Sequence, residues 1–135
     1  MTADIVQATV AKDLSIIVKG YTSSLARLRT AVTSTDADEV YIALGDLIEW
    51  LSRLENDPRV SSDADVQAVG FARDRAHHQW ASVVSTDAQG VSTWRPASLL
   101  PAPDNPRLAS AKKQPTYESR LEAKPILEVF DPSSR

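Results

Sequence analysis

The strongest constraint on how this chain folds is a series of apolar residues near its N-terminus, spaced alternately four and three apart. The series consists of Leu14, Val18, Tyr21, Leu25, Leu28 and Val32, and Val10 extends it backwards. Residues at this spacing lie on one side of an α-helix and form a heptad seam that another element must cover. We expect a helix from about Ala3 to about Thr33. Within it, Gly20 allows either close approach of another helix or a slight bend.

A second series with the same spacing follows a short turn. It comprises Val40, Leu44, Leu47, Leu51 and Leu54. Asp36, with Glu39 three residues later, resembles a capping box and predicts where this helix starts. Pro58 ends it, because proline disfavours helical geometry in the residue before it. Two such helices joined by a short turn should pack as an antiparallel hairpin, the alternative being a coiled coil between chains.

A third helix is predicted to start at Ser62 as its cap and to run to about Thr86, with Gly90 ending the segment. Its apolar arc consists of Val69, Ala72, Ala76, Trp80 and Val83. Together the three helices predict an all-α fold, an antiparallel helical bundle over residues 1–90. The length of 135 residues suits a single core.

The C-terminal third has a different character, since seven of the eight prolines lie from Pro96 onward. We expect a short extended piece at residues 91–94, an irregular stretch at 96–115 and a short helix at 117–123. Residues 91–135 therefore form a proline-rich tail with a short helix, packed on the bundle. Its last apolar residues, 126–130, either dock on the protein's own core or bind a partner or second copy.

Composition excludes several kinds of chemistry. The chain has no cysteine, so a disulfide or a thiolate metal site is ruled out. The four glycines are scattered, so no glycine-rich phosphate loop is present. The two histidines, His77 and His78, are adjacent and would point about 100° apart on a helix, which disfavours a histidine metal site. We expect no metal or cofactor, although a magnesium site made of carboxylates alone is not excluded.

Charge and hydropathy limit the partners. Residues 1–10 carry no basic region or long apolar run, and no stretch approaches the length of a membrane span, so we expect a cytoplasmic protein without a membrane partner. The net charge is −3 and the pI about 5.3. Contact with RNA or DNA would have to come from a local basic cluster or from two copies of one.

Residues 71–80 concentrate the groups that could carry chemistry. Arg73 and His77 are four residues apart, as are Asp74 and His78, so each pair shares a face of the third helix. Arg73 falls within the apolar arc, where an arginine should be paired or lie in a cleft or an interface. Arginine donates to phosphates and histidine transfers protons near neutral pH, so this stretch is a candidate phosphate site.

The order of these residues resembles the motif of HEPN (higher eukaryotes and prokaryotes nucleotide-binding) domains, typically Arg-Asn-x-x-x-His-x-Tyr. Here residues 73–80 read Arg-Asp-Arg-Ala-His-His-Gln-Trp. HEPN domains are small and all-helical, and many are metal-independent endoribonucleases that act as dimeric toxins or in phage defence. The chain is also similar to small helical proteins of actinobacteria and their phages, a likeness that implies no activity.

The resemblance implies a role for each motif residue. Arg73 would contact the phosphate and the transition state, His78 would be the acid and base, and Asp74 would orient them, with His77 and Arg75 in support. Two departures from the motif stand out: Asp74 adds a negative charge where the family has asparagine, and Trp80 lacks the tyrosine hydroxyl.

Two functions are therefore expected. The first is a metal-independent endoribonuclease of toxin or phage-defence type, acting as a homodimer on RNA and countered by an antitoxin or another protein partner. The second is a non-enzymatic helical protein that binds a protein partner through its C-terminal tail or through residues 94–96. The two differ in whether Arg73 and His78 converge on a positive cleft.

Overall fold

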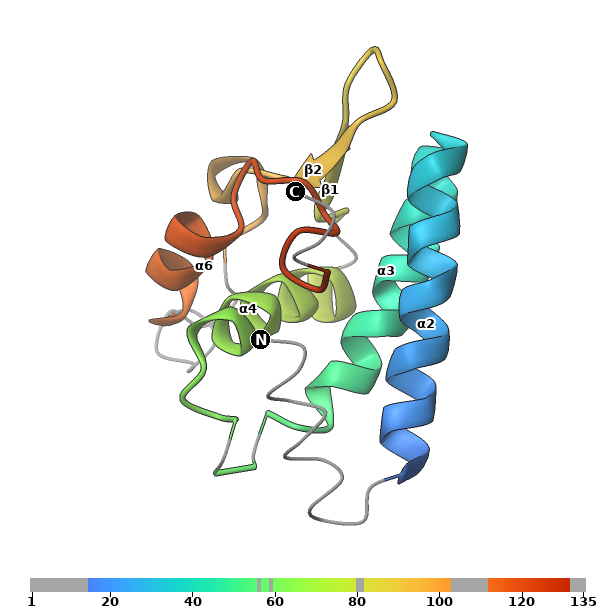
Figure 1. Ribbon diagram of the computed structural model, residues 1–135. Coiled ribbons are helices and arrows are strands. Elements are labelled where there is room, and N and C mark those ends of the chain that lie inside the picture. The colour runs from blue at the N-terminus through green and yellow to red at the C-terminus, as the bar shows by residue number, and fades with distance from the viewer. Residues whose placement is uncertain (1–14, 56, 59, 80–81, 103–111, 132–135) are drawn as a thin grey trace.

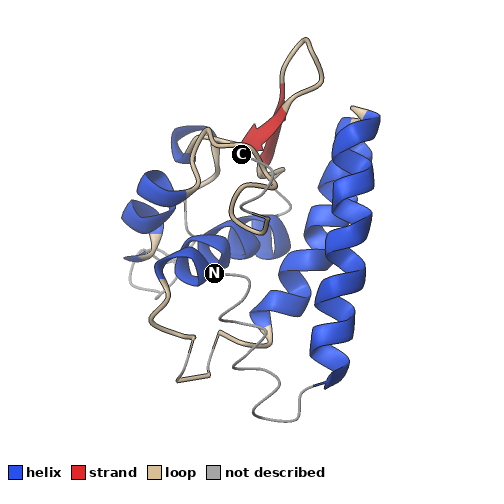
Figure 2. Ribbon diagram, viewed as in Figure 1, coloured by secondary structure: helices blue, strands red, loops and turns tan. Residues whose placement is uncertain are grey.

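The computed structural model describes residues 15–55, 57–58, 60–79, 82–102 and 112–131. In this part the chain is mainly helical and carries one small antiparallel sheet (Figures 1 and 2). The elements are α2 (Ser15–Ser34), α3 (Ala37–Ser52), α4 (Ala64–Gln79), β1 (Val84–Thr86), β2 (Ser92–Trp94), the 3₁₀ turn η1 (Ala97–Leu99) and α6 (Gln114–Arg120). The all-α prediction therefore holds in its coarse form, but it did not include the sheet.

The two heptad seams meet where α2 and α3 pack side by side (Figure 1). Buried residues come from both, namely Tyr21, Leu25 and Leu28 on α2 and Val40, Leu44, Leu47 and Leu51 on α3. Asp36 caps α3 as predicted, since its side chain accepts hydrogen bonds from the amides of Asp38 and Glu39. The predicted start of the first helix, including Val10 and Leu14, lies outside the described residues.

Helices α2 and α3 approach each other closely at Gly20. A Cβ atom at this position would lie 2.3 Å from the indole ring of Trp50. Of the two roles considered for this glycine, close approach of another helix is therefore the one observed. The Trp50 ring is covered on another side by the guanidinium of Arg53, 4.1 Å from the ring centroid.

The prediction that the third helix continues to about Thr86 is wrong. Helix α4 ends at Gln79, and Val84–Thr86 pairs instead with Ser92–Trp94 as a β-hairpin, with Val84 opposite Trp94. The β-branched residues of both segments suit a pleated strand. Gly90 serves the hairpin turn and not a helix end, with a φ of 81°. Trp80 lies outside the described residues.

The Asp87 side chain stabilises this turn. Its carboxylate accepts hydrogen bonds from the amides of Gln89 and Val91. A turn held by hydrogen bonds to an aspartate side chain lets the chain reverse direction within a few residues. The strands β1 and β2 can therefore pair directly on either side of it. The predicted extended piece at residues 91–94 is thus observed as β2, and the partner strand is the part that was mistaken for helix.

The C-terminal segment contributes to the same core as the helices. Trp94 is fully buried, and its ring lies 6.4 Å from that of Tyr117 and 6.1 Å from that of Phe130. Ile126 and Phe130 are each 1% exposed. The apolar tail therefore docks on the protein's own core, one of the two alternatives considered. The short helix lies at Gln114–Arg120, a few residues earlier than predicted.

Candidate functional site

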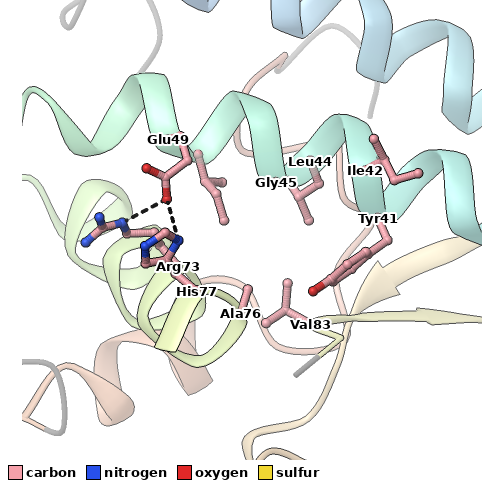
Figure 3. A pocket seen from close by; sticks show the side chains of 10 residues that line it. Tyr41, Ile42, Leu44, Gly45, Glu49, Arg73, Ala76, His77 and Val83 are labelled. Atoms are coloured by element: carbon pink, nitrogen blue, oxygen red, sulfur yellow. Dashed lines mark hydrogen bonds and ion pairs between the residues drawn. The ribbon is translucent and has the colours of Figure 1, made fainter. Parts of the chain in front are cut away.

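A pocket of about 450 Å³ opens between α3 and α4 (Figure 3). Helix α3 forms one wall, the second half of α4 forms another, and Val83 closes it just before β1. Its lining residues are Tyr41, Ile42, Leu44, Gly45, Ile48, Glu49, Arg73, Ala76, His77 and Val83. Most of them are apolar, so the pocket suits an apolar group, and its charged residues gather at one end.

That polar end is built around one carboxylate oxygen. Arg73 Nε donates to Glu49 Oε1 at 3.2 Å, and His77 Nδ1 lies 3.4 Å from the same oxygen. Arg73 Nη1 also lies 3.5 Å from Asp74 Oδ1. The charge of Arg73 is thus shared between two carboxylates. Arg73 was expected to be paired or to lie in a cleft or an interface, and it is both paired and in a pocket, but this end of the pocket is not strongly positive.

The structure brings some of the predicted site residues together and separates others. Arg73 and His77 line the pocket, and Asp74 flanks Arg73. Arg75 is 3% exposed, and its guanidinium lies 5.0 Å from the centroid of the Phe71 ring, away from the pocket lining. His78 lies on α4, but its side chain is outside what the structure describes.

Three residues of α3 complete the site and were not found from the sequence. Glu49 holds Arg73 and His77, Gly45 leaves open space in the wall, and Ile42 stands at the rim with 64% of its surface exposed. A Cβ atom at Gly45 would meet nothing within 4 Å. In the sequence, the signals that could have pointed to this site were a glycine and an isoleucine placed outside the apolar seam of a regular helix.

A half-buried carboxylate, Glu55, interacts with the charged residues of the pocket. Burial raises the pKa of Glu55 above its ordinary value of 4.5, and the neighbouring carboxylates of Asp74 and Glu49 act in the same direction. Lys113 and Arg73 oppose this by favouring the charged form. Arg73 therefore interacts with a set of acids as well as with the pocket.

Within the described residues, neither a metal-binding cluster nor a membrane-spanning helix is found. In this part of the chain, no group of three or more histidine, aspartate or glutamate side chains is placed to hold a metal ion. None of the helices described combines the length and the apolar character needed to cross a bilayer. The site can accommodate an apolar group. It can also hold an anionic oxygen between Arg73 and His77, where the Glu49 carboxylate lies in this structure.

Comparison with known proteins adds no further constraint. No protein-family model, curated protein or solved structure matches this chain. Function has to be inferred from the geometry of the pocket.

Proposed function

We propose that the protein is a non-enzymatic binding protein whose binding site is the α3–α4 pocket. The observation that carries this is the open apolar wall at Gly45, beside a polar end whose charges are already paired. Such a site favours the burial of an apolar side chain over the binding of a highly charged group. The C-terminal tail is not used for binding in this proposal, since Ile126 and Phe130 are buried in the core.

The test uses benzyl alcohol as a small probe and follows backbone amide shifts by NMR in dilute protein. The probe should shift the amides of residues 41–49 and 73–77 in a saturable way. Gly45→Phe should abolish these shifts by filling the pocket, and the matched variant Gly45→Ala should keep them, because there is space for a Cβ there. Shifts that persist in Gly45→Phe, or that map elsewhere, would refute the proposal.

A second candidate is the metal-independent endoribonuclease implied by the HEPN resemblance, acting as a cytoplasmic homodimer with an antitoxin or other partner. One observation favours it: Arg73 and His77 hold a single carboxylate oxygen between them, and a phosphate oxygen is bound by the same donors. It ranks second because a phosphate would have to compete with Glu49 and Asp74 for Arg73.

The second candidate is tested by incubating varied RNAs with the protein in the presence of a metal chelator. An active nuclease should cleave with the chelator present, and His78→Ala should lower the rate by about 10²-fold or more, as loss of a general acid–base does. His77→Ala is the matched variant that separates the two histidines. Equal cleavage by all three proteins would show that a contaminating nuclease is responsible. No cleavage would refute the endoribonuclease and leave the binding protein as the remaining candidate.

A further inference from the structure

The Glu49 carboxylate, at the polar end of the α3–α4 pocket, keeps one oxygen available as an acceptor. Arg73 Nε and His77 Nδ1 both meet Oε1, at 3.2 Å and 3.4 Å. Oε2 receives no hydrogen bond from the residues that the structure describes, and the side chain is 38% exposed. A carboxylate offers about four acceptor positions, and a bidentate arginine would occupy both oxygens, which Arg73 does not do here. Glu49 can therefore accept from a further donor.

The negative charge of Glu49 is only partly neutralised by its two contacts. Arg73 Nη1 also lies 3.5 Å from Asp74 Oδ1, so the single positive charge of Arg73 is divided between two carboxylates. His77 adds a positive charge only when it is protonated. A charged acceptor forms stronger hydrogen bonds with a cationic donor than with a neutral one. The oxygen left over at Glu49 is thus best matched by an ammonium group.

The open apolar wall lies one helical turn from this carboxylate. Gly45 and Glu49 are four residues apart on α3, so they share a face and are separated by about 6 Å along the helix axis. A Cβ atom at Gly45 would meet nothing within 4 Å. Ala76 and Val83 line the pocket across from α3 (Figure 3). A ligand whose apolar body fills the space beside Gly45 therefore brings a head group attached to that body close to Glu49.

We propose that the pocket binds a small hydrophobic amine, whose ammonium group donates to Glu49 while its apolar body lies beside Gly45. This rests on the proposed function, because it names the class of ligand for the same pocket. An anion held between Arg73 and His77 would have to displace the Glu49 oxygen that lies there. An ammonium group uses the other oxygen and leaves both existing contacts in place.

Three ligands that share a phenyl ring test the preference for a cation: benzylamine, the neutral benzyl alcohol and the anion phenylacetate. Each is titrated into the full chain at neutral pH and low salt, following the backbone amide shifts of residues 41–49 and 73–77 by NMR. Benzylamine should bind roughly threefold to tenfold more tightly than benzyl alcohol, and phenylacetate should bind most weakly. Added salt should reduce this preference, because the carboxylate is partly exposed.

Glu49→Gln tests whether the preference comes from this carboxylate. The glutamine keeps the size of the side chain and an acceptor oxygen for Arg73 and His77, but it removes the charge. The quantity compared is the Kd of benzyl alcohol divided by that of benzylamine, because this ratio cancels a general effect of the substitution on the pocket. It should fall to about one in Glu49→Gln.

Glu39→Gln is the matched control for the loss of charge. It makes the same change on the same helix, but Glu39 lines the hollow between α2 and α3 and not the α3–α4 pocket. The ratio of the two Kd values should stay as in the wild type. Circular dichroism of both variants checks that the fold is kept.

Gly45→Phe tests whether the amine lies inside the pocket. The phenylalanine ring should fill the apolar wall and abolish the binding of benzylamine together with that of benzyl alcohol, whereas Gly45→Ala should keep both. Benzylamine binding that persists in Gly45→Phe would place the amine on exposed carboxylates of the surface and overturn the inference.

The titrations can contradict the inference in three further ways. These are equal affinities for benzylamine and benzyl alcohol, tighter binding of phenylacetate, or a ratio that survives Glu49→Gln or falls equally in Glu39→Gln. Saturable, Gly45-dependent binding of benzyl alcohol without any preference for the amine would leave the proposed function standing while this inference falls. Failure of all three ligands to bind would remove both.

Discussion

Gly20 and Gly45 lie inside neighbouring helices, yet the same substitution should affect them in opposite ways. Gly20→Ala forces a methyl group into the Trp50 ring, 2.3 Å away, so it should lower the free energy of unfolding by roughly 1–3 kcal/mol. Gly45→Ala meets open space and removes backbone freedom, so it should raise that free energy by about 0.5–1 kcal/mol. Urea denaturation of the two variants measures both, and effects of equal sign would contradict this packing.

Glu55 should make stability depend on pH. Its pKa is raised in the folded protein by burial, so the neutral form is favoured there. The resulting stabilisation is present below the unfolded pKa and is lost as pH rises from about 4.5 through the folded pKa. Glu55→Gln, which stays neutral, should therefore gain stability relative to wild type as pH rises towards 7. Denaturation at acid and neutral pH tests this, and a constant difference would count against it.

At the scale of elements, the start of α3 depends on one carboxylate. Asp36 Oδ1 accepts from two amides that have no partner within the helix. Asp36→Ala should destabilise the protein by about 1 kcal/mol, and Asp36→Asn, which keeps an acceptor, by much less. Thermal unfolding of both variants separates the hydrogen bond from the charge. Equal losses would assign the effect to the charge at the helix start.

Local sequence patterns were sufficient to predict some of the secondary-structure elements but not others. The seams of α2 and α3 and the Asp36 cap were readable because neighbouring positions along the chain specify them. The segment Val84–Thr86 was assigned to a helix, because Val83 fitted the apolar arc of α4. Its strand conformation depends on pairing with Ser92–Trp94 and on the Asp87–Gly90 turn, which a helical period does not reveal.

At the scale of the whole molecule, the C-terminal segment is part of one core. Phe130 is 1% exposed and packs against Trp94, so Phe130→Ala should cost roughly 3–5 kcal/mol. Deleting residues 115–135 removes Tyr117, Leu121, Ile126 and Phe130 together. We expect the shortened chain to lose cooperative unfolding by circular dichroism. A deletion that still unfolds cooperatively would show that the helices fold without the tail.

The candidate site was half readable from the sequence. Arg73 stood out as an arginine within an apolar arc, which predicted that it would be paired or lie in a cleft or an interface. Glu49, Ile42 and Gly45 lie more than 20 residues earlier in the chain, and nothing local linked them to α4. Their part in the site appears when α3 and α4 pack together.

The sequence by itself determined the helical character of α2, α3 and α4, the α2–α3 hairpin and the position of its cap, because each depends on periodicity or on a hydrogen bond a few residues away. Tertiary structure decided three other features. It turned the end of the predicted third helix into a hairpin, buried the tail in the core, and placed Glu49 between Arg73 and His77. Each of these needs contacts between distant residues, whose free energy no local pattern encodes.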